Sequence, residues 1–376
     1  MVMPCMSYDK LQTIEPAYHP KSKMGFLIDW LITLKCNYDC SYCGIGIFGH
    51  DNSLPHPDYE KSLRMLKQLY AYTDVMMISK KQAFKDAIMN MYGGEAIFHP
   101  KFVDIAEATT REFEKYSDRW RLRRRITTNG TATVKNWKNI VKHIEGATMS
   151  YHSQGSKKLK NLFYKNLEHI IDIKMQYDVV VLMYPHEDHW QDCVEFMQYC
   201  KKNKIIARPR LLDGGRGKYN SQQIEDLSEF LNKEELKSIL PGENVDGQVR
   251  ACCGGRPLCT NRDLKTPQRL VPRGPAGYRG WKCSASQFFI FGNNVNGQYF
   301  TNKDCHVRLD QTRGPVATIH TMDDYTDTMR KQVNNGSGPP ILTCVQDECL
   351  CGTCAPKSRS LESLQDIMKI YNTTKR

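Results

Sequence analysis

Three cysteines close together in the chain, Cys36, Cys40 and Cys43, are the side chains best suited to chemistry. They directly follow an apolar run at residues 25–34, so a loop at the end of a predicted strand carries all three thiolates. When only three thiolates hold a 4Fe-4S cluster, one iron keeps an open position, as catalytic metal sites do. A structural zinc loop is the alternative, but zinc takes four protein ligands in such sites, and no fourth cysteine or suitably placed histidine follows closely.

The composition agrees with metal ligation. The chain has 376 residues, 15 of them cysteine, and a formal net charge of +12. In a reducing compartment so many cysteines indicate metal ligands sooner than disulfides. No apolar run reaches the ~20 residues of a membrane helix, and residues 1–10 lack a signal-peptide pattern, so we expect a cytoplasmic protein without a membrane span. The positive charge favours acidic or phosphorylated partners, and specific nucleic-acid binding is not expected.

Short apolar runs alternate with amphipathic helical patterns between residues 21 and 216, which is typical of βα units and a parallel sheet. Six units can be counted. Strands are predicted at 25–34, 87–92, 125–128, 147–152, 179–184 and 205–212, with helices near 57–72, 102–113, 134–144, 159–170 and 190–200. The predicted fold class is α/β, a partial (β/α)6 TIM-like barrel whose chemistry lies at the C-terminal ends of the strands.

The rest of the chain is divided by its composition. Residues 1–20 read as an N-terminal tail, 21–216 as the barrel, 217–248 as a helical connector and 249–376 as a small Cys-rich C-terminal domain. In that domain, residues 288–291 and 298–301 flank a turn at 293–297 and predict a β-hairpin. Residues 361–371 predict a terminal helix.

The C-x3-C-x2-C spacing, with Tyr42 before the last cysteine, resembles the radical S-adenosylmethionine (SAM) superfamily. Gly93-Gly94-Glu95 ends the second strand and is similar to the family motif that binds the SAM amino group, although Ala96 stands where the family has proline. Two glycines would let the backbone approach the ligand, and the glutamate would accept from the ammonium. Thr128-Asn129-Gly130 resembles the family's strand-end signature. The resemblance implies a catalytic 4Fe-4S cluster with SAM on its open iron, and SAM contacts from Tyr42, Gly93, Gly94, Glu95, Thr128, Asn129, Ser150 and His152.

A second group of cysteines lies in the C-terminal domain. The hairpin can bring its flanking Cys283 and Cys305 together. With Cys351 and Cys354 they resemble the twitch domain, the shorter relative of the SPASM extension, which implies one auxiliary 4Fe-4S cluster. Cys349 is a further candidate ligand. A second auxiliary cluster stays open as an alternative, because Cys252, Cys253, Cys259 and Cys344 are also available. Cys252, Cys253 and Cys259 could instead include a hydrogen-atom donor or be thiols without a special role.

Three weaker signals have ordinary structural explanations. The His186-Glu187-Asp188-His189 loop could bind a metal, but its carboxylates also suit a helix N-terminus. The glycine-rich stretch at 213–217 could cradle a phosphate or serve as a plain exit loop. The arginine run at 119–125 invites an RNA interpretation, but we expect a solvated face on the approach to a strand. Cys193 and Cys200 share a helical face with apolar residues and are expected in the core.

The resemblance implies an enzyme that cleaves SAM reductively to a 5′-deoxyadenosyl radical, which then abstracts a hydrogen atom from the substrate. Twitch and SPASM relatives act mainly on peptides, so modification of a peptide or protein side chain is the first expectation. Oxidation of a small molecule such as a sugar or nucleotide is the alternative. A non-catalytic iron-sulfur electron carrier is the alternative from another class. The partners implied are a peptide or acidic small-molecule substrate and an electron donor such as flavodoxin or ferredoxin.

Overall fold

The computed structural model describes residues 26–43, 50–78, 86–212, 219–231, 249–251, 270–272, 280–301, 314–337, 340–343, 357–358, 360–362 and 364–365. The predicted boundaries at residues 216 and 248 lie outside these ranges, so the division into domains stays a prediction. Within the described residues, every helix is too short or too polar to span a bilayer.

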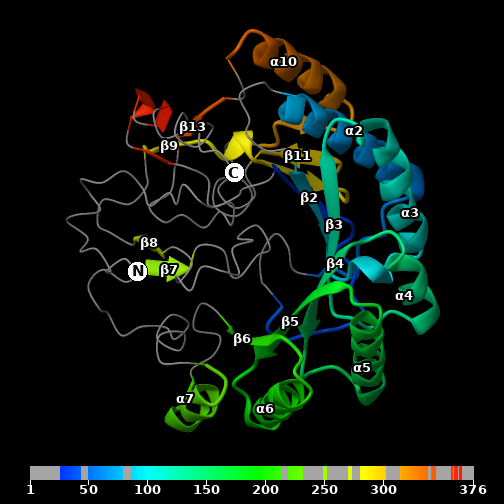
Figure 1. Ribbon diagram of the computed structural model, residues 1–376, viewed down its shortest axis with the longest axis vertical. Helices are drawn as coiled ribbons and strands as arrows, with labels where there is room; N and C mark the ends of the chain where they lie inside the picture. Colours follow the sequence, from blue (N-terminus) through cyan, green and yellow to red (C-terminus); the bar gives the residue numbers. More distant parts are fainter. Residues whose placement is uncertain are drawn as a thin grey trace.

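Six parallel strands, paired in chain order, form the half-barrel that the sequence predicts. They are β1 (Phe26–Leu31), β2 (Asp86–Tyr92), β3 (Arg121–Thr128), β4 (Gly146–Tyr151), β5 (Gln176–Met183) and β6 (Ala207–Leu211). The connecting helices are α2 (Tyr59–Ile78), α3 (Phe102–Phe113), α4 (Val134–Ile140), α5 (Lys157–Asp172) and α6 (Glu187–Lys202). Figure 1 shows these helices in an arc along one side of the curved sheet. The α/β fold class and all six βα units are therefore confirmed.

Alternation along each strand separates two faces of the sheet. On β1, Phe26, Ile28 and Trp30 are fully buried in the core under the helices. The opposite face carries polar side chains as well as apolar ones. There Asn90 donates to the carboxylate of Asp29 over 3.3 Å, and Thr127 donates to Asn90 over 3.1 Å. The inner face of the half-barrel thus carries both polar and apolar side chains, as does a surface that binds a ligand or packs against another part of the chain.

The predicted β-hairpin forms, and it extends the main sheet. Its strands are β10 (Phe289–Asn293) and β11 (Gln298–Phe300), and Gly297 in the turn has φ +65°. β10 pairs in parallel with β1, and β12 (Ala317–Thr318) pairs with β11, so the sheet has nine strands. Apolar side chains of β10 and β11 pack with those of β1 and β2 in one cluster. The hairpin therefore borders the half-barrel at its first strand.

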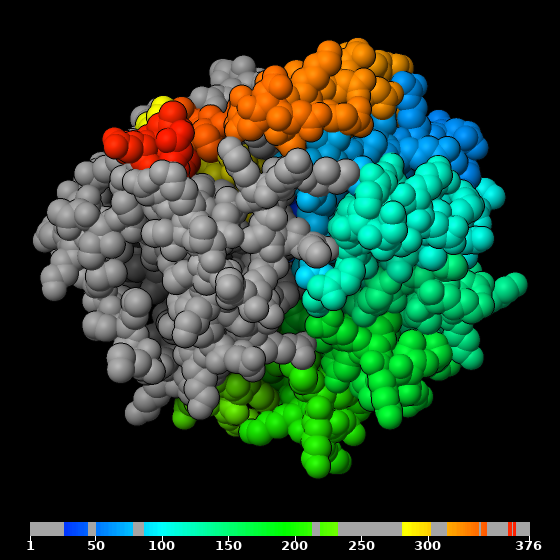
Figure 2. All heavy atoms as spheres, turned by 45° about the horizontal axis from the view of Figure 1, so that its top comes forward, coloured from blue at the N-terminus to red at the C-terminus, as the bar shows by residue number. Residues whose placement is uncertain are grey.

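A helix from the C-terminal part also packs on the barrel. α10 (Met322–Asn334) lies against α2, as the orange and blue surfaces in Figure 2 show. Gln68 of α2 donates to Asp323 over 3.1 Å and accepts from the Tyr299 hydroxyl over 2.7 Å. Tyr72 and Tyr325 stack with ring centroids 5.8 Å apart. These contacts attach β11 and α10 to α2.

The remaining described elements are short. β9 (Lys282–Cys283) is the middle strand of a small sheet between β13 (Leu342–Thr343) and β14 (Lys357–Ser358). β7 (Val249–Ala251) pairs with β8 (Leu270–Pro272). In the predicted connector, α7 (Ser221–Ser228) begins with a capping box on Asn220. One-turn 3₁₀ helices lie at η1 (Ala96–Phe98), η2 (Glu114–Tyr116) and η3 (Ala285–Gln287). Of the predicted terminal helix, residues 361, 362, 364 and 365 are described, and they are helical.

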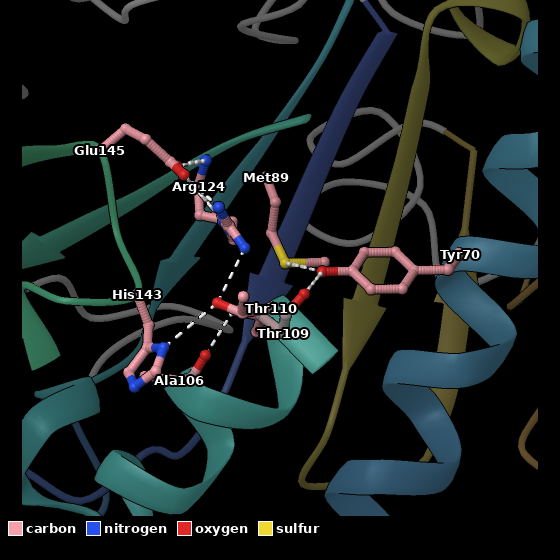
Figure 3. A network of polar contacts seen from close by, with 8 residues as sticks. All are labelled: Tyr70, Met89, Ala106, Thr109, Thr110, Arg124, His143 and Glu145. Atoms are coloured by element: carbon pink, nitrogen blue, oxygen red, sulfur yellow. Dashed lines mark hydrogen bonds and ion pairs between the residues drawn. The ribbon is translucent and has the colours of Figure 1, made fainter. Parts of the chain in front are cut away.

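The arginine run at 119–125 is a solvated face in part, because Arg119, Arg121 and Arg123 are exposed, as the sequence predicts, whereas Arg124 and Arg125 are not. Most of it lies inside β3, where Arg125 is only 5% exposed. Arg124 forms an ion pair with Glu145 and donates to Thr110 of α3 over 2.8 Å. Figure 3 shows this contact within a polar network that joins β3, α3 and α2. Arg124 thus joins β3 to α3 and to Glu145. The strand extends four residues further toward its N-terminus than the apolar pattern indicates, so it includes this arginine.

Candidate metal centre

The cysteine loop follows β1 and is held against the end of β2 by backbone hydrogen bonds. Ile32 N–H donates to Tyr92 O over 2.7 Å, Gly94 N–H to Thr33 O over 2.9 Å and Glu95 N–H to Lys35 O over 2.8 Å. The parallel pairing of β1 and β2 thus continues to the residue before Cys36.

The two glycines of Gly93-Gly94-Glu95 are required by this approach. A Cβ atom at Gly93 would lie 2.3 Å from Thr33 O, and one at Gly94 would lie 2.4 Å from Leu34 O. Both positions are closer than real side chains tolerate, and the obstructing atoms are backbone. The sequence motif predicts that these glycines let a ligand approach the backbone. In the structure the partner that comes close is the backbone of the cysteine loop.

Glu95 connects the second and third strand-end motifs. Its Oε1 accepts from Ile97 N–H over 3.0 Å and from the Thr128 hydroxyl over 2.8 Å, and its Oε2 accepts from Asn129 N–H over 2.5 Å. The side chain is 3% exposed. Burial raises the pKa of Glu95 to about 7, and the three hydrogen bonds oppose that rise. Since a carboxylate has about four acceptor sites, part of Oε2 is still available to a ligand ammonium.

Cys36 is positioned by asparagines from three parts of the chain. Its N–H donates to Asn52 Oδ1 over 3.0 Å, and its Sγ lies 3.9 Å from Asn129 Nδ2. The same Asn129 amide donates to Asn37 Oδ1 over 2.8 Å, and Asn37 Nδ2 donates to the Thr131 hydroxyl over 2.8 Å. The sequence analysis missed Asn37, Asn52 and Thr131. Only the position of Asn37 between two cysteines could have indicated a role.

Cys40 lies beside His152 and Tyr42. His152, directly after β4, has its Nδ1 3.6 Å from Cys40 Sγ and 2.9 Å from the Tyr42 hydroxyl oxygen. Burial lowers the pKa of His152 to about 4, so the imidazole is neutral at physiological pH. Ser150, two residues earlier, is half-buried on β4. The structure therefore places His152 against Cys40 and Tyr42 of the cysteine loop. Ser150 lies on β4, the strand that ends directly before His152.

The next turn of the loop is joined to the residues after β4. Ser41 N–H donates to Gln154 Oε1 over 2.8 Å, and the Ser41 hydroxyl donates to the Tyr184 oxygen over 3.1 Å. A Cβ atom at Gly155 would lie 2.4 Å from the ring of Tyr38. Gln154 and Gly155 were also missed in the sequence, where nothing marks them as neighbours of the cysteines. Together β1, β2, β3, β4 and β5 contribute to one site at their C-terminal ends.

The chemistry of the thiols fits an iron-sulfur cluster. Burial, with the nearby Glu95 carboxylate as a second cause, raises the pKa of Cys36 to about 12. Burial also raises the pKa of Cys40 to about 11. Thiols in such surroundings ionise together only when a cationic centre compensates them, because a bound metal reverses these pKa shifts. A cubane bound there would supply that centre through Cys36, Cys40 and Cys43.

A site for a single metal ion is the alternative to a cluster. Across the described residues, no three His, Cys, Asp or Glu side chains converge as ligands of a single ion. Zinc requires four such ligands, with Zn–S distances of about 2.3 Å. In a cubane each thiolate binds a different iron, so the three sulfurs need not converge on one point.

Of the predicted auxiliary-cluster ligands, only Cys283 is described. It is buried on β9, where it pairs with Leu342 of β13 and Lys357 of β14. Cys305, Cys349, Cys351 and Cys354 lie outside the described residues, as do Cys252, Cys253, Cys259 and Cys344. The chain segment 344–356 carries four of these cysteines, and the strands on either side of it both pair with β9. The described residues Leu342 and Lys357, on the strands that flank this segment, are therefore register partners of Cys283.

The weaker signals have structural explanations where they are described. His186 directly precedes α6, and Glu187 and Asp188 lie in the first turn of this helix, as expected for a helix start. Cys193 and Cys200 are 0% and 1% exposed in the core, which confirms their predicted role. The glycine-rich stretch at 213–217 lies outside the described residues.

Comparison with known proteins gives matches among solved structures alone. No protein-family model and no curated protein matches the chain. A structure of native anSMEcpe with bound AdoMet and Cp18Cys peptide is 14% identical, with a TM-score of 0.47, over 80% of this chain and 79% of that chain. Its complex with AdoMet and Kp18Cys peptide is 15% identical, with a TM-score of 0.47, over 80% and 79%. Histidine-tagged anSMEcpe with bound AdoMet is 14% identical, with a TM-score of 0.46, over 82% and 76%.

Proposed function

We propose that this chain is a radical SAM enzyme. The observation that carries the proposal is the joining of three separate motifs into one site. The cysteine loop after β1 is hydrogen-bonded to Gly94 and Glu95 after β2, and Glu95 is hydrogen-bonded to Thr128 and Asn129 at the end of β3. A purely electron-carrying iron-sulfur protein would need the cysteines but not this convergence.

The residues of the site have distinct roles in this proposal. Cys36, Cys40 and Cys43 would hold a 4Fe-4S cluster, which, when reduced, supplies the electron that splits SAM into methionine and a 5′-deoxyadenosyl radical. The free acceptor capacity of Glu95 suits the SAM ammonium, because a charge-assisted hydrogen bond in a buried site is strong. The further SAM contacts proposed are Gly93, Gly94, Tyr42, Thr128, Asn129, Ser150 and His152, which lie on the cysteine loop or at the C-terminal ends of β2, β3 and β4. An electron donor such as flavodoxin or ferredoxin would reduce the cluster, and the net positive charge of the chain favours an acidic partner of this kind.

The finer proposals concern the C-terminal part and the substrate. Cys283 would ligate one auxiliary 4Fe-4S cluster with Cys305, Cys351 and Cys354, with Cys349 as a further candidate. The burial of Cys283 between Leu342 and Lys357, its register partners on the strands that precede and follow residues 344–356, supports this ligand set. The substrate proposed is a peptide or protein side chain, which rests on the resemblance to twitch and SPASM enzymes.

Iron content and SAM cleavage test the core of the proposal. Anaerobically reconstituted protein should bind about seven to eight irons, as two cubanes with four irons each require. Under reduction it should release 5′-deoxyadenosine from SAM. The triple variant with Cys36, Cys40 and Cys43 changed to alanine should keep about four irons and lose cleavage. The matched control changes the buried core thiols Cys193 and Cys200 to alanine, and it should keep both properties. Cleavage by the triple variant would contradict the assignment.

Deuterium transfer tests the substrate class. A peptide pool prepared in fully deuterated form should pass deuterium into 5′-deoxyadenosine, detected by mass spectrometry, because the radical takes a hydrogen atom from its substrate. Deuterated sugar and nucleotide pools serve as the comparison. Transfer from either of these, and none from peptides, would favour the small-molecule alternative.

A further inference from the structure

The sulfur of Cys40 has a hydrogen-bonding environment of its own. His152 Nδ1 lies 3.6 Å from Cys40 Sγ, and a hydrogen bond from the Tyr42 side chain lowers the pKa of the Cys40 thiol against the larger effect of burial. The two partners also contact each other, because His152 Nδ1 is 2.9 Å from the Tyr42 oxygen. Hydroxyl, imidazole and sulfur thus form a closed triad, and none of its members is adjacent in sequence to another.

The triad is held rigidly. The imidazole of His152 lies parallel to the Tyr42 ring, with 6° between the planes and 5.9 Å between centroids, and 5.4 Å from the Tyr38 ring. Cys40 and Tyr42 are 7% and 8% exposed. Gly155 N–H donates to His152 O over 3.1 Å and fixes the turn after β4. Water is therefore a poor competitor for the hydrogen bonds of the sulfur.

The direction of the hydrogen bonds follows from the chemistry of a ligating thiolate. Such a sulfur carries no proton and can only accept. The Tyr42 O–H therefore donates to Cys40 Sγ, and a neutral imidazole protonated on Nδ1 donates to the Tyr42 oxygen. Each hydrogen bond of such a chain polarises the next, so His152 strengthens the bond from Tyr42 to the sulfur.

We propose that Tyr42 and His152 form a hydrogen-bond relay to Cys40 that makes the reduction potential of the cluster less negative. The proposal rests on the proposed function, since it requires a cluster on Cys36, Cys40 and Cys43. Reduction adds one negative charge to the cluster and its thiolates, so a donor to sulfur stabilises the reduced form more than the oxidised form. Tyr42 and His152 are positioning residues in this proposal, whereas the family resemblance implies that they contact SAM.

Redox titration of the full-length reconstituted protein, followed by electron paramagnetic resonance without SAM, measures this effect directly. The signal of this cluster is the one that is absent in Cys40→Ala. Tyr42→Phe removes the hydroxyl and keeps the ring, and it should lower the equilibrium constant for one-electron reduction up to tenfold, a shift of about 59 mV to more negative potential. Tyr184→Phe is the matched control, since that hydroxyl oxygen accepts from Ser41 and the ring lies 5.0 Å from Tyr42.

His152 provides a second, independent pair of variants. His152→Leu should lower the same equilibrium constant several-fold, because Tyr42 loses its polarising donor. His152→Asn should return it toward the original value, because the amide nitrogen can take the place of Nδ1 and donate to Tyr42. A variant that merely loosened the loop would show no such rescue. If Tyr42→Phe fails to bind iron, the comparison of the two His152 variants still decides the question.

The outcomes separate the relay from other roles. Potentials of Tyr42→Phe and His152→Leu that match that of Tyr184→Phe overturn the relay. Unchanged potentials together with weakened SAM binding, measured calorimetrically, would assign both residues to the ligand instead. A full-length protein that forms no cluster on the three cysteines would contradict the proposed function itself, which the iron count shows before any potential is measured.

Discussion

Replacing Glu95 with glutamine tests the centre of the site with a change of a few atoms. In the structure this buried carboxylate accepts three hydrogen bonds, two of them from the third strand-end motif. Burial raises its pKa from 4.5 to about 7. The native protein therefore favours the protonated form of Glu95 relative to the unfolded chain, and glutamine resembles that protonated form in shape and in its single strong acceptor.

The magnitude follows from this pKa difference. Each pH unit between the folded and unfolded pKa corresponds to about 1.4 kcal/mol, so an ionised Glu95 reduces the free energy of unfolding by about 3 kcal/mol. This loss is absent below pH 4.5, grows as the pH rises toward 7 and is complete above it. Glutamine turns its NH2 group toward a backbone or hydroxyl donor that the carboxylate accepts, which costs about 1–3 kcal/mol at every pH. Glu95→Gln should therefore be less stable than the original protein near pH 4.5, and its free energy of unfolding should rise by about 3 kcal/mol relative to the original protein by pH 8.

The same variant should bind SAM more weakly. The ammonium of SAM would lose a charge-assisted hydrogen bond worth about 1.5–3 kcal/mol, which is roughly a ten- to hundredfold loss of affinity. Urea unfolding of the cluster-free protein at pH 5 and pH 8 measures the stability, and calorimetry on the reconstituted protein measures the affinity. Such a site trades stability for ligand binding, as is common where a charge is buried for function.

The control is Glu112→Gln. Glu112 is also buried, at 8% exposed, but Lys115 and Arg111 are paired with it on the outside of the barrel. Although burial alone raises the pKa of Glu112, these cations hold it below its usual value. Its replacement should reduce stability at pH 8 and leave SAM affinity unchanged. If Glu95→Gln gains no stability relative to the original protein between pH 5 and pH 8 and binds SAM equally well, the carboxylate is not the ammonium acceptor and the reasoning is refuted.

Three further predictions address the surroundings. Gly94→Ala places a Cβ 2.4 Å from Leu34 O, so we expect a cost of about 1–3 kcal/mol in unfolding and a loss of four irons with unchanged circular dichroism. Asn166→Leu removes the donor to two carbonyl oxygens of the turn after β3 and should cost about 1–3 kcal/mol in urea, whereas the exposed Asn136→Leu should stay within about 0.5 kcal/mol. Cys283→Ala should lose about four irons and substrate turnover but keep substrate-free SAM cleavage; an unchanged iron count would remove Cys283 from the ligand set.

Elements with strong local patterns were predictable. The six strands and their helices follow apolar periodicity, and the observed bounds differ from the predicted ones by a few residues in most cases. The larger differences are that α2 ends six residues later and α4 four residues earlier than predicted, and that β3 begins four residues earlier. The first half of β3 is rich in arginine, and Leu122 is its one apolar residue. The hairpin of β10 and β11 was also predictable, since its turn and alternation are local. Its pairing with β1 joins residues more than 250 positions apart, and no local pattern encodes that choice.

The candidate site was predictable in its motifs and not in its contacts. The cysteine spacing and the Gly-Gly-Glu and Thr-Asn-Gly sequences identified positions that do converge. The glycines have a structural reason that the sequence did not indicate, because the atoms that obstruct a Cβ belong to a backbone about 60 residues away, while their contact with a ligand stays a prediction. Asn37, Asn52 and Gln154 went unnoticed since asparagine and glutamine are common on surfaces. Only their hydrogen bonds to the loop distinguish them.

The sequence by itself determined the six βα units, the place of a three-thiolate loop at the end of the first strand and the candidate partners at the ends of the next three. Short-range periodicity and fixed spacing carry that information. The tertiary structure alone decided which atoms meet: Glu95 with the backbone of Asn129, and His152 with the hydroxyl of Tyr42 and the sulfur of Cys40. The physical reason is that strand register and the paths of the loops place these atoms to within a few tenths of an ångström. Hydrogen bonds and steric exclusion depend on distance at that scale, whereas a sequence motif specifies only the order of residues along the chain.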